Sequence, residues 1–145
     1  MPSQRSSSTS CVMDVMMEVI GDPNLCVPVL VSLRYEVGEP YAVFLDIQAD
    51  AGGPITWFFA RDLLLAGLHQ RSGRGDVAVN PGDGHSSEYV FISLMGVDAA
   101  AVLRVRAADI RCFLQQAELV VPAGAEEEYF DVDALIHRLL GHPTP

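Results

Sequence analysis

The stretch that decides the fold is VPVLVSLRYEVGEPYAVFLDIQADAGGPITWFFA, residues 27–60. It contains three runs rich in β-branched and aromatic residues: Val27–Tyr35, Tyr41–Ala49 and Ile55–Ala60. Gly38-Glu39-Pro40 and Gly52-Gly53-Pro54 separate these runs, and Gly and Pro each favour tight turns. Three strands joined by short turns predict an antiparallel meander.

The flanking sequence extends this pattern on both sides. Upstream, Cys11–Ile20 partly alternates between polar and apolar residues, which predicts a strand. Residues 21–24, Gly-Asp-Pro-Asn, are turn formers. Downstream, Gly- and Pro-rich punctuation separates short runs that predict further strands at Asp76–Val79, Tyr89–Leu94 and Ala101–Val105.

Three segments have helical spacing instead. Residues 62–68 predict a short helix, and residues 110–117 and 132–140 predict two amphipathic ones. The apolar positions of these two helices are Ile110, Phe113, Leu114, Ala117, Val132, Leu135, Ile136, Leu139 and Leu140. Asp131 is placed to cap the last helix, and Pro122–Tyr129 is expected to be a linker. The predicted class is α+β, with a mostly antiparallel sheet of about six or seven strands and three helices.

Length and composition fit one domain of 145 residues. We expect a Ser-rich disordered tail over 1–10, a single domain over 11–141 and a short tail over 142–145. The start shows no export signal, and no run reaches the roughly 18 apolar residues of a membrane span, so a soluble cytoplasmic protein is expected. Cys11, Cys26 and Cys112 form no C-x-x-C pair, and we expect reduced, buried thiols.

The formal net charge of −10, with nine basic residues that are all Arg, disfavours nucleic-acid and anionic membrane partners. No motif indicates catalysis. The glycines from Gly73 to Gly84 match neither a dinucleotide fingerprint nor a P-loop, and the four histidines have no metal-binding spacing. Asp83, His85, Ser86 and Ser87 are consecutive or nearly so, which predicts a polar hairpin loop and not a triad. We therefore expect no catalytic, cofactor-binding or metal-binding residues, and no cofactor.

Two charged groups remain as candidate partner-docking residues. Arg104 and Arg106 alternate on one predicted strand face, and Arg111 lies on the following helix, so together they could receive an acidic segment of a partner. Glu126, Glu127 and Glu128 have no basic residue among them and are expected to be exposed in the linker as an acidic docking surface.

From Leu33 onward the sequence resembles the SsgA-like proteins, which control sporulation-specific cell division in filamentous spore-forming bacteria. The matching segments, over roughly three-quarters of the chain, are Leu33-Arg34-Tyr35, Pro40-Tyr41-Ala42-Val43, Trp57–Leu64, Gly67-Leu68, Gly73, Gly75-Asp76-Val77, Phe113-Leu114, Val121–Glu126 and Phe130–Asp133. The chain departs from the family at Asn80, where Trp is usual, and in the loop Gly82–Glu88.

The resemblance implies a curved, Whirly-like sheet and a non-enzymatic adaptor that packs as a trimer. It implies that the protein acts at the division septum and recruits the tubulin-like GTPase FtsZ, promoting its assembly. A paralogue role is also implied, in localising the recruiter or in septal peptidoglycan remodelling and spore maturation. The expected partners are thus FtsZ, another SsgA-like protein, and further copies of this chain.

Two other function classes stay open on the residues alone. Single-strand nucleic-acid binding would need an Arg-lined groove with stacking aromatics, for which Trp57, Phe58 and Phe59 are candidates. A small acid–base enzyme would need a carboxylate or His from 126–133 buried beside Arg61, Arg104 or Arg106.

Overall fold

The computed structural model describes residues 9–21, 25–48, 53–97 and 100–140. The strands in these ranges are β1 (Ser10–Ile20), β2 (Cys26–Glu36), β3 (Ala42–Ile47), β4 (Ile55–Ala60), β5 (Val77–Pro81), β6 (Tyr89–Met95) and β7 (Ala100–Arg106). The helices are α1 (Arg61–Ala66), the 3-10 turn η1 (Gly84–Ser86), α2 (Ala107–Val120), α3 (Glu126–Tyr129) and α4 (Val132–Leu139).

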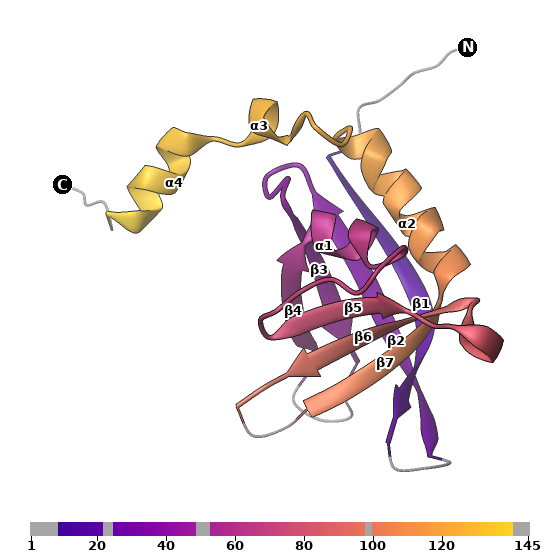
Figure 1. Ribbon diagram of the computed structural model, residues 1–145. Helices are drawn as coiled ribbons and strands as arrows, with labels where there is room; N and C mark the ends of the chain where they lie inside the picture. The colour runs from indigo at the N-terminus through magenta and orange to yellow at the C-terminus, as the bar shows by residue number, and fades with distance from the viewer. Residues whose placement is uncertain (1–8, 22–24, 49–52, 98–99, 141–145) are drawn as a thin grey trace.

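All seven strands belong to one antiparallel sheet in the order β4-β3-β2-β1-β7-β6-β5 (Figure 1). Strands β1–β4 form one meander and β5–β7 a second, so the antiparallel meander predicted from residues 27–60 is confirmed. The two meanders meet where the end of β1 pairs with β7, with Glu18 opposite Arg104. The predicted α+β class is confirmed as well.

The core lies on the inner face of this curled sheet. Because side chains alternate along a strand, every second residue is buried, as Val31, Leu33 and Tyr35 are on β2. Helix α2 packs across β1, β2 and β7 and buries its apolar face there. Helix α1 follows β4 directly and contacts both β4 and β5, so it connects the two edge strands.

Several boundaries and environments differ from the sequence prediction. Strand β1 begins at Ser10, inside the expected tail, and the Thr9 carbonyl accepts a hydrogen bond from the Val37 N–H at 2.9 Å. Residues 1–8 and 142–145, the rest of the two expected tails, lie outside the described residues. The expected linker contains the short helix α3. The expectation of buried thiols is wrong for Cys26 and Cys112, which are exposed.

The chain ends in an arm made of α3 and α4, which extends away from the sheet and from α2 (Figure 1). The predicted helix over 132–140 is present as α4, but its described apolar side chains are exposed and do not join the core. The predicted polar hairpin loop is confirmed, since residues 82–88 connect β5 to β6; the 3-10 turn η1 within it was not predicted.

Candidate partner-docking site

A buried ion pair connects the start of α1 to the start of α3. Arg61 is 4% exposed and Glu126 is 8% exposed. The Arg61 Nη2 donates to Glu126 Oε2 at 2.5 Å, and its Nη1 donates to the Val121 carbonyl oxygen at 2.7 Å. The Gly124 N–H donates to Glu126 Oε1 at 2.9 Å. The Arg61–Glu126 pair thereby fixes the chain beyond α2 to the helix that connects the sheet edges.

The ring of Tyr35 forms the floor beneath this pair. The guanidinium carbon of Arg61 lies 4.8 Å from the Tyr35 ring centroid, a cation–π geometry that stabilises more when it is desolvated. The Tyr35 hydroxyl donates to the Pro40 carbonyl oxygen at 2.7 Å. Burial raises the pKa of Tyr35 to about 12, so this hydroxyl keeps its proton at neutral pH.

The pair bears on the acid–base hypothesis, which required a buried carboxylate beside an arginine. Glu126 meets that requirement, and its expected exposure as a docking residue is wrong because α3 turns it inward. The hydrogen bond from Arg61 lowers the pKa of Glu126, against the opposite effect of burial. A carboxyl group that serves as a general acid near neutral pH has a raised pKa, and the shift at Glu126 is in the opposite direction. The contacts of Glu126 are those of a structural anchor.

This lowered pKa predicts acid sensitivity. A carboxylate whose pKa is lower in the folded state than in the unfolded state stabilises the fold at any pH above its ordinary pKa, here 4.5. This contribution to the free energy of unfolding is lost as the pH falls through the folded-state pKa. Glu126→Gln removes the charge but keeps the shape. We expect the wild type to exceed this variant in free energy of unfolding at pH 7, and the gap to shrink below about pH 4.5. Urea midpoints from pH 7 to 3 measure it; a constant gap contradicts the prediction.

Arg104 and Arg106 lie together, as their alternation predicts. They line a cavity of about 320 Å³ with Met16, Glu18, Pro28, Tyr89, Val105 and Asp109. Their guanidinium carbons are 4.7 and 5.7 Å from the Tyr89 ring centroid. Arg104 is paired with Glu18 at 2.5 Å, and this hydrogen bond raises the pKa of Arg104. Arg106 is more exposed, and its ion pair with Glu88 is long at 3.9 Å, so its charge is the more accessible of the two.

The other predicted docking residues lie elsewhere. Arg111 lines a different cavity, between α1 and α2, and so does not join Arg104 and Arg106 in one cluster. Glu127 and Glu128 are exposed on α3, as expected. The basic group is divided because Arg111 lies on α2 whereas Arg104 and Arg106 lie on β7. The acidic group is divided because successive residues of a helix point in different directions.

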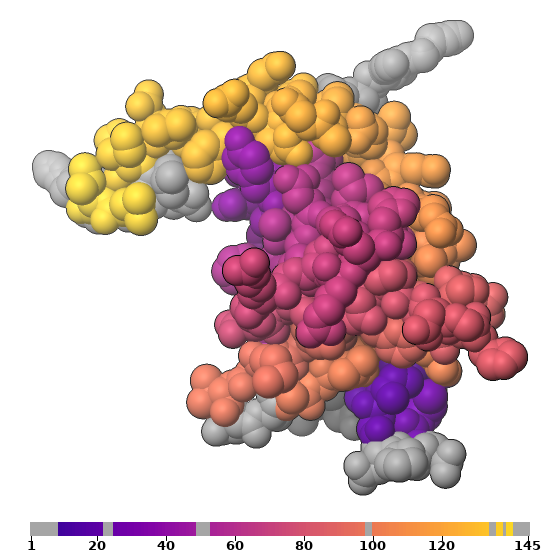
Figure 2. All heavy atoms as spheres, viewed as in Figure 1, coloured from indigo at the N-terminus to yellow at the C-terminus, as the bar shows by residue number. Residues whose placement is uncertain are grey.

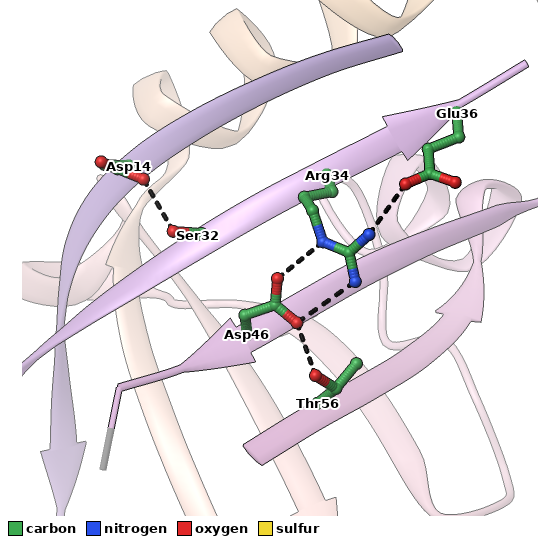
Figure 3. Close-up of polar contacts among 6 residues, drawn as sticks. All are labelled: Asp14, Ser32, Arg34, Glu36, Asp46 and Thr56. Carbon is green, nitrogen blue, oxygen red and sulfur yellow. Dashed lines mark hydrogen bonds and ion pairs between the residues drawn. The ribbon is translucent and has the colours of Figure 1, made fainter. Parts of the chain in front are cut away.

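The outer face of β1–β4 carries a polar network that sequence reasoning missed (Figure 3). Arg34 Nε donates to Asp46 Oδ2 at 2.6 Å, and Nη1 donates to Glu36 Oε2 at 2.8 Å. Thr56 donates to Asp46 Oδ1 at 2.6 Å. These hydrogen bonds, led by that from Arg34, lower the pKa of Asp46. Alternation could have placed each residue on the outer face, but only the register, in which Asp46 lies opposite Ser32 and Arg34 lies opposite Phe44, makes Arg34 and Asp46 diagonal neighbours.

Apolar side chains surround this network on the same face. The register forms a cross-strand row of Val12, Arg34, Phe44 and Phe58. The Phe44 and Phe58 rings are stacked with centroids 6.1 Å apart, and Phe58 is 67% exposed. A mixed apolar and polar sheet face of this kind is typical of interaction surfaces.

Within the described ranges, no group of three or more His, Cys, Asp or Glu residues could hold a metal ion. No helix in the same part of the chain is both long and apolar enough to cross a membrane.

Comparison with known proteins identifies the family. A family model described as "Streptomyces sporulation and cell division protein, SsgA" matches residues 29–126. The chain belongs to the SsgA family. The sporulation-specific cell division protein SsgB of Streptomyces coelicolor is 35% identical over 135 residues, which cover 93% of this chain and 97% of that protein. SsgB of Salinispora tropica is 34% identical, with 91% and 94% covered.

Solved structures agree with this assignment. An SsgB structure, described with mutations that correlate to longitudinal cell division during sporulation of Streptomyces coelicolor, gives a TM-score of 0.79 at 32% identity. The matched region covers 88% of this chain and 100% of the SsgB chain. An SsgA-like sporulation-specific cell division protein from Thermobifida fusca YX-ER1 has the same score and identity, covering 94% and 99%.

The residues that carried the family resemblance now have a structural role. Tyr35, Pro40, Arg61, Gly124 and Glu126 come from four separate matching segments, and all take part in the contacts around the buried ion pair. The most specific sequence block of this SsgA-family chain, Trp57–Leu64, therefore supplies the fold's internal anchor. Docking surfaces of this chain are therefore expected among its exposed residues.

Proposed function

We propose that this SsgA-family chain is a non-enzymatic adaptor of sporulation-specific cell division, which recruits FtsZ to septum sites and promotes its assembly. The observation that carries the proposal is similarity along almost the whole chain to proteins named SsgB, 35% identical over 93% of its length. Among the described residues, Arg61–Glu126 is the one buried carboxylate–arginine pair. The lowered pKa of Glu126 supports a structural role for this pair and not a catalytic one.

The proposed recruiter acts in the cytoplasm at the division septum as a homo-oligomer, a trimer by family resemblance. The exposed Phe58 and its neighbours on the outer sheet face favour association, since burial of apolar surface stabilises contacts between copies. Arg106 supplies an exposed positive charge for acidic segments of FtsZ. The alternative within the family is a paralogue that acts through another SsgA-like protein or in septal peptidoglycan remodelling and spore maturation.

Co-sedimentation with GTP-assembled FtsZ from the same organism, over a salt series, tests the proposal. We expect the protein to pellet with polymer, to increase the polymer mass, and to bind less as salt screens the charges. Arg106→Glu should weaken binding about fivefold, because an exposed ion pair contributes up to about 1 kcal/mol.

Arg71→Glu is the matched control, since it makes the same charge change at an exposed position away from the Arg104–Arg106 cavity. Equal loss of binding in both variants would assign the effect to net charge and reject Arg106 as a docking residue. Absence of pelleting at every salt concentration would reject recruitment and favour the paralogue role.

A further inference from the structure

The last helix presents an apolar stripe that no other described part of the chain covers. Ile136, Leu139 and Leu140 lie at helical spacing in and just after α4, and the two leucines are 74% and 77% exposed. A helix of eight residues is too short to be stable in water by itself. Its stability has to come from packing of this stripe against another surface.

An apolar groove of suitable character lies between α1 and α2. It has a volume of about 390 Å³, which is room for several aliphatic groups and not only for water. Leu65 and Leu68 form one wall, and Leu114 on α2 forms part of the other. Arg111, which has no ion pair among the described residues, adds an exposed positive charge to the α2 wall.

The path of the arm leads α4 away from the groove of its own chain. The Arg61–Glu126 pair fixes the start of α3 beside α1. Phe130 then packs edge-on against Tyr41, with ring centroids 5.6 Å apart, which directs the chain over the β2–β3 turn. Figures 1 and 2 show α4 projecting from the body on the side opposite to α2.

We propose that the α1–α2 groove of one copy receives the last turn of α4 from a second copy. Ile136, Leu139 and Leu140 would pack on Leu65, Leu68 and Leu114. The carbonyl groups at a helix C-terminus carry partial negative charge, so the end of α4 should lie beside Arg111 and away from Asp62 and Glu118, which also line the groove. The contact joins two different surfaces, so repeating it forms a ring when the rotation closes. The inference thus rests on the homo-oligomer of the proposed function, and adds a contact between copies to the one that the outer sheet face favours.

Disulfide trapping tests the proposed contact between α4 and the α1–α2 groove directly. In a background with Cys11→Ala, Cys26→Ser and Cys112→Ser, Leu65→Cys and Ile136→Cys are made in separate chains and mixed under mild oxidation. We expect a Leu65→Cys to Ile136→Cys heterodimer on a non-reducing gel. Val97→Cys, which is fully exposed on the β6–β7 connection, reports random collision in the same mixture.

Two alternative binding surfaces for α4, the outer sheet face and the groove of its own chain, give distinct results. Trapping of Ile136→Cys to Phe58→Cys in place of Leu65→Cys would place α4 on the outer sheet face and overturn the proposal. A disulfide that forms only within a chain carrying both Leu65→Cys and Ile136→Cys would mean that α4 folds back, which overturns it too.

Sedimentation velocity supplies a second measurement. Leu139→Asp should weaken self-association at least about tenfold, since it places a charge where the proposed contact would bury the leucine side chain. Arg111→Glu should weaken it as well, and Arg74→Glu, the same charge change at an exposed position outside the groove lining, should not. If Leu139→Asp does not change the oligomeric state, the proposed α4 contact is wrong, although the homo-oligomer of the proposed function is not contradicted. A wild-type monomer at micromolar concentration would overturn both.

Discussion

Glu126→Ala is expected to lower the free energy of unfolding by about 3–5 kcal/mol, the cost of leaving one member of a buried ion pair without its partner. The variant leaves the Arg61 guanidinium in the interior, where its Nε already lacks a hydrogen-bond partner among the described residues. It also removes the acceptor of the Gly124 N–H, so the start of α3 loses two of its attachments. Urea unfolding at pH 7, followed by circular dichroism, measures the change.

Glu127→Ala is the matched control for this variant. Glu127 is the next residue of α3 and is exposed, so its removal should change the free energy of unfolding by less than about 0.5 kcal/mol. The double variant Arg61→Met with Glu126→Leu should recover part of the loss, because apolar residues of similar volume often replace a buried pair at little cost. Equal, small effects of Glu126→Ala and Glu127→Ala would contradict the anchoring role.

The fold was accessible from the sequence because the information is local. Alternation in β2 and β3 and the Gly- and Pro-containing turns between strands specify an antiparallel meander without reference to distant residues. The junction of β1 with β7 was not accessible in this way. It pairs Glu18 with Arg104, and no periodicity specifies which strands of two separate meanders become neighbours.

The charged residues show the same division between local and distant information. Arg104 and Arg106 were placed together correctly because period-two alternation puts them on one face. Glu126 was misplaced because three consecutive glutamates look like a solvated surface, and the residue that selects one of them for burial, Arg61, lies 65 positions earlier. Helix α4 was found by its apolar periodicity, yet the same periodicity says nothing about which surface covers it.

Gly67→Ala is expected to destabilise the protein by about 1–3 kcal/mol, the range for overpacking a core. Gly67 ends α1 with an ordinary helical φ of −66°, so the constraint on this position is space and not backbone conformation. A Cβ at Gly67 would lie 2.2 Å from Val79 Cγ1 and 2.5 Å from Val79 Cβ, and Val79 is fully buried on β5. Elsewhere, Gly→Ala at a compatible site stabilises by about 0.4–1 kcal/mol.

The sign of the change therefore tests the contact between α1 and β5. Gly38→Ala is the control, because no atom lies within 4 Å of its Cβ position, and it should be neutral or stabilising. Val79→Ala opens space at the contact, so the Gly67→Ala and Val79→Ala double variant should be more stable than the sum of the single effects predicts. Additive losses would show that α1 does not press on Val79. In Gly67→Ala, the clash with Val79 should push α1 away from β5. Because α1 begins with Arg61 and carries Leu65 in the groove wall, this movement should weaken both the ion pair and the proposed α4 contact.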